Sequence, residues 1–273
     1  WPHRLEDGGR ANPSAVSAVI PPPTPVVQSR IYEISTHYES KDGTMVPITY
    51  SHKSSIKLDK NTPIFLYAYG DYNISIRPAF TPKYVAWLEM GGVLAVANIR
   101  GGGEFGKAWH NAGRLDTKQN VFDDFLYASK FLENNSIGNR KSTVISGRSN
   151  GGLLVGTTLV QNPNYFGAAL PAVGVMDMIR FTEFTEGWGW RGDYGSPILN
   201  QTDFQRNIKI SPYHQTKIDV CYSPTLTTTG RRDDRVVPSH SYKFTARLQE
   251  YQGCTNPVML YDATRAGHGS GNG

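Results

Sequence analysis

The sequence predicts an α/β fold in which a doubly wound, mostly parallel sheet is covered by helices on both faces. Two observations carry this prediction: runs of strand length alternate with segments of helical periodicity, and several of the runs are apolar throughout. Apolar strands of this kind are typical of a parallel sheet that is buried on both sides. We therefore expect one domain over residues 28–273, with a small antiparallel entry, and a proline-rich arm before it at residues 1–27.

The elements follow in a regular order. The expected strands lie at 32–38, 45–51, 63–69, 92–98, 142–146, 168–175, 224–229 and 258–261. The expected helices lie at 120–134, 152–161 and 239–252, with Asn120 as the N-cap of the first. A turn at Lys41-Asp42-Gly43-Thr44 joins the first two strands as a hairpin. An aromatic-rich insertion occupies residues 181–212.

Composition excludes several classes of function. The formal net charge is +5 over 273 residues, but basic and acidic residues are interspersed, so no nucleic-acid-binding surface is indicated. No apolar run approaches the ~20 residues of a membrane span. Cys221 and Cys254 form neither a disulfide framework nor a zinc set, so we expect reduced thiols and neither metal nor cofactor. Few cysteines and no convincing signal segment favour a cytoplasmic location.

A candidate nucleophile lies in residues 144–155, VISGRSNGGLLV. Ser149 follows an expected strand, precedes an expected helix, and has glycine two residues before and two residues after it. A nucleophile on such a turn requires these glycines, because side chains there would collide with neighbouring backbone. The alternative is a glycine-rich bend that only happens to hold a serine. The presence of a base and an orienting acid distinguishes the nucleophile from the ordinary bend, because serine at neutral pH needs a base that a third group orients.

The expected partners follow downstream in the order acid, then histidine, that α/β-hydrolases share. His268 lies in a glycine-flanked loop directly after the last expected strand. His214 lies in a polar turn and His240 at the start of a helix, and we expect both to be solvated. Asp233 and Asp234 follow the preceding strand, and spacing alone does not choose between them. Neighbouring arginines would keep either carboxylate ionised at neutral pH.

Long stretches of the chain resemble the prolyl oligopeptidase family of serine peptidases. These stretches lie at residues 91–104, 149–155, 173–178, 233–238 and 266–269, and the likeness covers residues ~28–273. The resemblance implies an α/β-hydrolase fold with Ser149 as nucleophile, Asp233 as the orienting acid and His268 as the base. It also implies that the phenol of Tyr69 and the backbone N–H of Asn150 stabilise the oxyanion. A donor of this kind contributes about 10²–10³ in kcat.

The resemblance further implies an apolar, aromatic pocket for proline. Trp190 would stack on the pyrrolidine ring, and Arg235 would bind a substrate carbonyl. The other expected pocket residues are Tyr72, Val175, Tyr194 and Val236. Proline is rigid and lacks an N–H group, so shape and stacking have to select it.

The chain departs from the family's pattern at several points. Asp71 stands where the family has glycine, Tyr72 stands where it has phenylalanine, and Arg148 stands before the nucleophile where glycine is usual. A positive φ at Asp71 would strain the turn, and its charge would disfavour a nearby oxyanion, so Asp71→Gly is expected to raise kcat. The family also carries a β-propeller and a closing helix. We therefore expect a fragment that leaves apolar sheet surface uncovered.

Taken together, the residues predict a serine endopeptidase that cleaves short proline-containing peptides on the carboxyl side of proline through an acyl-enzyme. One alternative is a related esterase, acylaminoacyl peptidase or basic-residue oligopeptidase. Trp190 and the apolar pocket argue against a basic side chain as the main target. The other alternative is a catalytically impaired hydrolase-like module. The intact set of Ser149, Asp233 and His268 argues against a long-standing loss of catalysis.

Overall fold

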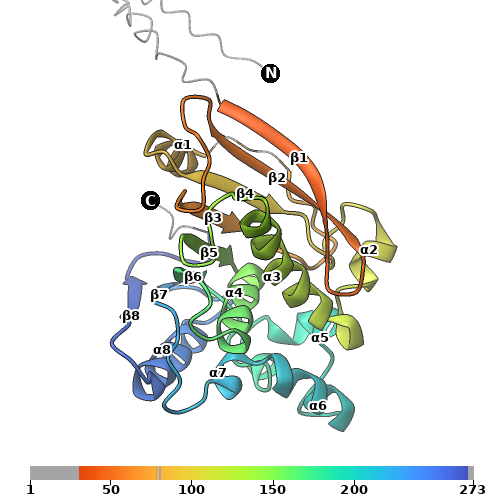
Figure 1. The fold of residues 1–273 in the computed structure, drawn as a ribbon. Helices are drawn as coiled ribbons and strands as arrows, with labels where there is room; N and C mark the ends of the chain where they lie inside the picture. The colour runs from red at the N-terminus through yellow and green to blue at the C-terminus, as the bar shows by residue number, and fades with distance from the viewer. Residues whose placement is uncertain (1–30, 78, 80, 270–273) are drawn as a thin grey trace, which may run out of the picture.

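A single sheet of eight strands organises the chain in the computed structural model, which describes residues 31–77, 79 and 81–269 (Figure 1). The arm expected at residues 1–27 lies outside the described residues. The strands are β1 (Ile31–Glu39), β2 (Met45–Lys53), β3 (Ile64–Tyr67), β4 (Val93–Ala97), β5 (Thr143–Arg148), β6 (Ala168–Ala172), β7 (Thr225–Gly230) and β8 (Val258–Ala263). Their order across the sheet is β1-β2-β4-β3-β5-β6-β7-β8.

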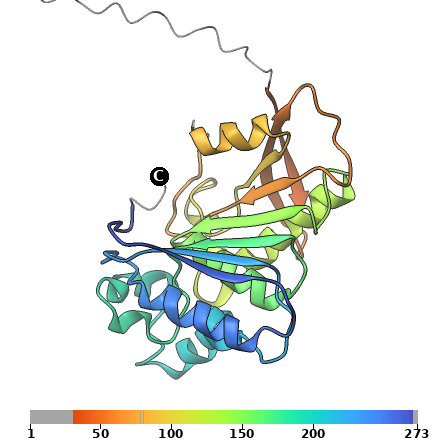
Figure 2. The ribbon, with the colours of Figure 1, turned by 90° about the vertical axis from the view of Figure 1, so that its left-hand side faces the viewer.

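The strand directions match the predicted architecture. The β1–β2 hairpin is antiparallel and pairs antiparallel with β4, whereas β4, β3, β5, β6, β7 and β8 run parallel to one another. Figure 2 shows the twisted sheet from the side, with β1 and β2 at one end and β8 at the other. The antiparallel entry and the mostly parallel sheet confirm the predicted α/β class.

Helices cover both faces of the sheet. Successive side chains of each strand point to opposite faces, so every strand contributes side chains to both layers. The helices are α1 (Pro82–Glu89), α2 (Lys107–Asn111), α3 (Gln119–Asn134), α4 (Asn150–Gln161), α5 (Arg191–Tyr194), α6 (Gln201–Ile210), α7 (Pro212–Gln215) and α8 (Ser239–Tyr251). Phe65 of β3 packs against Tyr84 and Trp87 of α1, with ring centroids 5.8 and 5.9 Å apart. Its neighbours Ile64 and Leu66 point to the other face and are fully buried in the main core, to which α3, α4 and α8 contribute.

The structure corrects some local predictions. The three predicted helices are present as α3, α4 and α8, but the N-cap of α3 is Lys118, and Asn120 lies within the helix. The Nδ2 group of Asn120 donates to the carbonyl of Ala112 at 2.9 Å instead. The helices α1, α2, α5, α6 and α7 were not predicted, because they are short or lie in polar and aromatic stretches without clear periodicity.

The expectation of two reduced thiols is wrong. Cys221 and Cys254 form a disulfide, with their Cα atoms 5.0 Å apart. Helix α8 returns the chain to the start of β7, where Val220 and Gln252 form a bridge, and this brings the two cysteines together across 33 residues. Spacing alone could not reveal this pairing.

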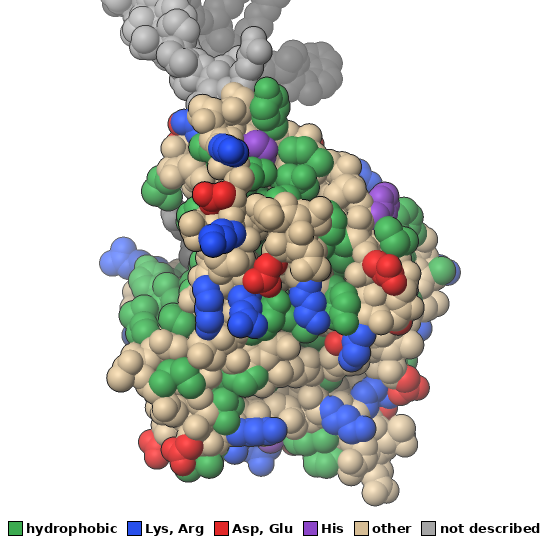
Figure 3. Space-filling view, in the orientation of Figure 1, with side chains coloured by type: hydrophobic (Ala, Val, Ile, Leu, Met, Phe, Trp, Pro, Cys, Tyr) green, Lys and Arg blue, Asp and Glu red, His purple; other side chains and the backbone are tan. Residues whose placement is uncertain are grey.

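On the face shown in Figure 3, several Lys and Arg side chains lie in a row across the middle of the molecule, with single Asp and Glu side chains beside them. No helix within the described residues is long and apolar enough to cross a membrane. At the edge of the sheet, β8 exposes Met259, Leu260 and Tyr261, with 50%, 36% and 57% of each residue accessible. Because successive strand residues point to opposite faces, Met259 and Tyr261 are exposed on one face and Leu260 on the other.

Candidate active site

Ser149 lies on a sharp turn between β5 and α4. Its φ of 57° and ψ of −118° are uncommon for a residue with a side chain. A Cβ atom on Gly147 would lie 2.2 Å from the carbonyl oxygen of Gly151, and one on Gly151 would lie 2.9 Å from the carbonyl oxygen of Ala68. Both glycines are therefore required by close backbone contacts, and the turn holds Ser149 at the carboxyl end of the parallel sheet.

His268 and Asp233 meet in the loops that follow β8 and β7. The Nδ1 atom of His268 lies 2.7 Å from Oδ2 of Asp233, whose side chain is fully buried. The other carboxylate oxygen accepts hydrogen bonds from the backbone N–H groups of Arg235 and Val236 at 3.0 and 2.9 Å. Asp234 is exposed, so the structure places Asp233 and not Asp234 beside the imidazole. Because this contact uses Nδ1, the Nε2 atom is left for proton transfer.

The two other downstream histidines do not have the predicted surroundings. His240 is 1% exposed, and its Nδ1 accepts a hydrogen bond from the backbone N–H of Asp177 at 3.1 Å. Burial lowers the pKa of His240 to about 4. His214 is partly buried and bonds Ser211 Oγ at 2.8 Å, and burial lowers its pKa as well. The expectation of a solvated side chain is wrong for His240, which is buried against the backbone of Asp177, whereas His214 keeps 26% of its side chain exposed.

Two hydrogen-bond donors flank Ser149. Tyr69, two residues beyond β3, lines the same cavity as Ser149, and burial, aided by the charge of Asp71, raises the pKa of its phenol to about 12. The phenol therefore stays a neutral donor near pH 7. Asn150 is the first residue of α4, where backbone N–H groups have no partner within the helix and the helix dipole is positive. The arrangement can stabilise negative charge that develops beside Ser149.

The side chain of Asn150 connects these donors. Its Nδ2 group donates to the carbonyl of Tyr69, and its Oδ1 accepts from the hydroxyl of Tyr194 at 2.7 Å and from Nζ of Lys118 at 3.5 Å. The residue is 2% exposed. Because these bonds fix the end of β3 relative to the start of α4, the two donors are held in a defined geometry before any ligand arrives.

Asp71 has a different environment from the one expected. It is fully buried, and its Oδ2 lies 2.7 Å from Nζ of Lys118. Positive φ values occur at Gly70, Tyr72 and Asn73, not at Asp71, so the expected strain at this residue is absent. Burial raises the pKa of the Asp71 carboxyl, and the Lys118 charge opposes that rise. The ion pair offsets the negative charge that was expected to weaken the oxyanion site.

A cavity of about 300 Å³ opens beside Ser149. It is lined by Tyr69, Tyr72, Ile74, Ser149, Asn150, Val175, Gly189, Trp190 and Arg235. Trp190 stacks on Phe181 with ring centroids 6.3 Å apart and planes 11° apart, which holds the indole at the cavity wall. The Arg235 guanidinium lies 3.3 Å from Glu186, and both side chains are largely exposed.

Two expected pocket residues lie behind the wall. Tyr194 and Val236 are 1% and 2% exposed and are not among the residues that line the cavity. Tyr194 instead supports Tyr72 edge to face, at 5.9 Å between centroids. Ile74 and Gly189 line the cavity but were missed, and no local pattern singled them out.

Arg148 is partly buried, which lowers its pKa, and the charge of Asp233 acts in the opposite direction.

Comparisons with known proteins agree with this geometry. The sequence profile described as the prolyl oligopeptidase family matches residues 78–273. The prolyl endopeptidase of Elizabethkingia miricola is 47% identical over 234 residues, which cover 86% of this chain and 33% of that protein. Prolyl oligopeptidase A of Amanita bisporigera is 41% identical over 237 residues, which cover 86% of this chain and 31% of that protein. The chain thus spans about a third of the length of these curated relatives.

Solved structures give the same result. A structure from a study of two prolyl endopeptidases superimposes with a TM-score of 0.82 at 45% identity, covering 85% of this chain and 34% of that one. Prolyl oligopeptidase B from Galerina marginata, bound to a 35mer hydrolysis and macrocyclization substrate, gives 0.83 at 39% identity, covering 86% and 33%. These likenesses confirm the predicted α/β-hydrolase fold.

Proposed function

Because the chain belongs to the prolyl oligopeptidase family, we propose that it is a serine endopeptidase that cleaves short peptides on the carboxyl side of proline. One observation carries the proposal: Ser149 lies on a strained turn and lines the same aromatic cavity as Tyr69 and Trp190. The buried Asp233–His268 pair at neighbouring strand ends adds the acid and base that a serine nucleophile needs.

In the proposed reaction, Ser149 Oγ attacks the carbonyl carbon of the proline residue while Nε2 of His268 takes the hydroxyl proton. The carbonyl oxygen becomes an oxyanion that accepts hydrogen bonds from the Tyr69 hydroxyl and the Asn150 N–H. Asp233 stabilises the imidazolium, which then gives its proton to the leaving amine as the C–N bond breaks. Water, deprotonated by His268, attacks the acyl-enzyme and releases the carboxylate product together with free Ser149.

Proline selection follows from the shape of the cavity. Trp190, backed by Phe181, offers a rigid aromatic surface on which a pyrrolidine ring stacks, and Val175 supplies an apolar contact. Arg235 is free to turn toward a substrate carbonyl, because an exposed pair such as Arg235–Glu186 is weak. Tyr72 adds a second aromatic wall, which Tyr194 supports from behind.

The proposed substrates are short proline-containing peptides. Prolyl endopeptidases at 47% identity support this class, as does a family member solved with a peptide substrate. A cytoplasmic location also stays a proposal. The Cys221–Cys254 disulfide weighs against it, because disulfides persist mainly in oxidising compartments.

Labelling and turnover together test the proposal. The protein is titrated with a fluorophosphonate probe and assayed with a fluorogenic Gly-Pro amide, an Arg amide and a simple ester. We expect one labelled serine, cleavage of the Gly-Pro amide, and loss of both in Ser149→Ala. Ester turnover alone would favour an esterase. Absence of labelling in the folded protein would favour the impaired module.

A pair of tryptophan variants tests the pocket. Trp190→Ala should lower kcat/KM for the Gly-Pro amide by about tenfold, since aromatic stacking and apolar burial together contribute about 1.4 kcal/mol or more. Trp188→Ala is the matched control, because Trp188 lies two residues away, is 62% exposed and does not line the cavity. Equal losses in the two variants would contradict the assignment of Trp190.

A further inference from the structure

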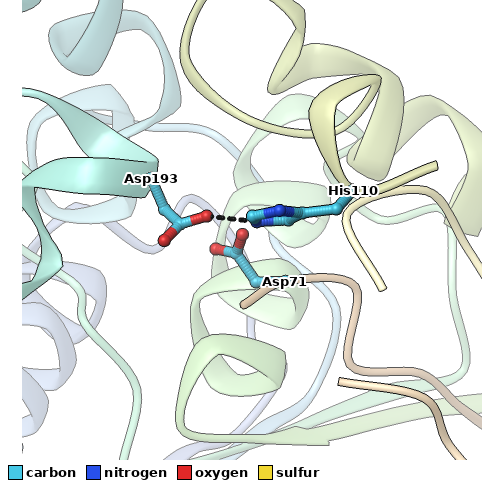
Figure 4. Close-up of side chains that lie close together, drawn as sticks. All are labelled: Asp71, His110 and Asp193. Atoms are coloured by element: carbon cyan, nitrogen blue, oxygen red, sulfur yellow. Dashed lines mark hydrogen bonds and ion pairs between the residues drawn. The ribbon is translucent and has the colours of Figure 1, made fainter. Parts of the chain in front are cut away.

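Three ligand-type side chains converge beside the cavity, where the sequence indicated no metal site. Asp71 comes from the loop after β3, His110 from α2 and Asp193 from α5, as Figure 4 shows. Each offers one oxygen or nitrogen atom, and these atoms lie within 4.8 Å of one another. Nε2 of His110 lies 2.6 Å from Oδ1 of Asp193, and their side chains are 15% and 13% exposed.

One carboxylate oxygen of Asp71 in this cluster is unsatisfied within the described residues. Its Oδ2 pairs with Lys118, but its Oδ1 is buried and has no hydrogen-bond partner among the described residues. In Figure 4 the Asp71 carboxyl group points toward the gap between His110 and Asp193. Burying a carboxylate oxygen without a hydrogen-bond partner raises the free energy of the folded protein. A cation in that gap would offset this cost by coordinating the oxygen.

We propose that Asp71, His110 and Asp193 bind a divalent transition-metal cation, with Zn²⁺ as the best fit. One imidazole and two carboxylates form a donor set that Zn²⁺ accepts, with water as a fourth ligand. The imidazole nitrogen disfavours Mg²⁺ and Ca²⁺, which prefer oxygen ligands. Tetrahedral Zn²⁺ ligands lie about 3.4 Å apart, given bonds of about 2.0–2.1 Å. The three atoms therefore need only small side-chain rotations to reach that arrangement.

The charges around the cluster permit a cation. Asp71 and Asp193 bring two negative charges, and Lys118 brings one positive charge from the Oδ2 side of Asp71. The two carboxylates therefore outnumber the one ammonium group beside them. A carboxylate can contact an ammonium group through one oxygen and a metal through the other.

Metal binding would join three segments that border the cavity. The Asp71 loop also carries Tyr72, and α5 directly follows the 3₁₀ turn that ends at Trp190. A shared cation would fix these two walls relative to each other and to α2. Any effect on peptide cleavage rests on the proposed function, whereas binding itself does not.

Calorimetric and thermal-shift titrations of the chelator-treated protein test the site. We expect ZnCl₂ to bind with a stoichiometry of one and to raise the melting temperature, and MgCl₂ to do neither. His110→Gln and Asp193→Asn should each weaken Zn²⁺ binding by about 100-fold, since even outer-shell changes cost 10–100-fold. His37→Gln is the matched control, because His37 is exposed on β1 and is not one of the three cluster residues. Its affinity should equal that of the wild type.

Two results would overturn the proposal. One is the absence of Zn²⁺ binding in a folded, chelator-treated protein. The other is binding that survives in His110→Gln and Asp193→Asn, or that falls equally in His37→Gln, because the cation would then sit elsewhere. Circular dichroism of each variant without metal ensures that lost binding does not reflect lost folding. Co²⁺ substitution gives a separate readout, since tetrahedral coordination produces intense visible bands that His110→Gln should abolish.

Discussion

Nζ of Lys118 lies 2.7 Å from Oδ2 of Asp71, and their side chains are only 2% and 0% exposed. Removing one partner of such a pair leaves an uncompensated buried charge, at a cost of about 3–5 kcal/mol. We therefore expect Asp71→Gly to lower the free energy of unfolding by about that amount and not to raise kcat. Urea denaturation followed by fluorescence measures the change.

Two further variants separate the ion pair from a general effect of substitution. Asp71→Gly combined with Lys118→Met should recover much of the lost stability, since no buried charge is then left alone. Lys41→Met removes the exposed Lys41–Asp123 pair and should cost less than about 1 kcal/mol. An Asp71→Gly protein with wild-type stability and raised kcat would restore the oxyanion-repulsion interpretation.

The structural features that were predicted well from the sequence are those that depend on local sequence patterns. The strands and the longer helices follow from periodicity, and the turn at Ser149 follows from glycines whose absent side chains make room for nearby backbone. His268 and the pair Asp233 and Asp234 were singled out because parallel strands end at one edge of a sheet, so loops far apart in sequence meet there, whereas the choice of Asp233 came from the family resemblance.

What the sequence could not predict depends on packing between distant segments. Lys118 reaches Asp71 across 47 residues, and no spacing rule connects them. The same holds for Cys221 and Cys254, and for the cluster of Asp71, His110 and Asp193. Tyr194 was expected at the cavity surface but lies behind it, because its hydroxyl bonds Asn150 and its ring supports Tyr72.

The buried His240 should make stability depend on pH. Its pKa is about 4 in the folded protein, against about 6.5 when unfolded, so between these values the unfolded chain binds a proton that the folded one does not. The free energy of unfolding should fall by up to about 3 kcal/mol as the pH drops from 7 to about 4, with no further loss from this group below that. Urea denaturation across this range measures the slope.

Two histidine variants test whether His240 causes this pH dependence of the free energy of unfolding. His240→Gln keeps an acceptor for the Asp177 N–H but does not titrate, so its stability should depend less on pH than that of the wild type. His37→Gln changes an exposed histidine and should keep the wild-type slope. Equal slopes in all three proteins would show that His240 is not buried in its neutral form.

The disulfide should contribute measurably to stability. It closes a loop with a sequence separation of 33 residues, for which restriction of the unfolded chain amounts to about 2–4 kcal/mol. Reduction with dithiothreitol should therefore lower the denaturation midpoint of the wild type. The double variant Cys221→Ser, Cys254→Ser should start at the lower value and not respond to reductant. A response in that variant would point to an effect unrelated to these cysteines.

Tyr69→Phe tests the oxyanion donor directly. The variant removes only the hydroxyl proposed to stabilise the oxyanion beside Ser149, so kcat for the Gly-Pro amide should fall by about 10²–10³ while KM changes little. Tyr67→Phe is the control, because Tyr67 lies two residues earlier, at the end of β3, and lines a different cavity. Since the pKa of Tyr69 is raised to about 12, the donor stays protonated up to about pH 10, and the loss in Tyr69→Phe should be the same at pH 7 and pH 9. A loss that disappears at pH 9, or that Tyr67→Phe reproduces, would remove Tyr69 from the proposed mechanism.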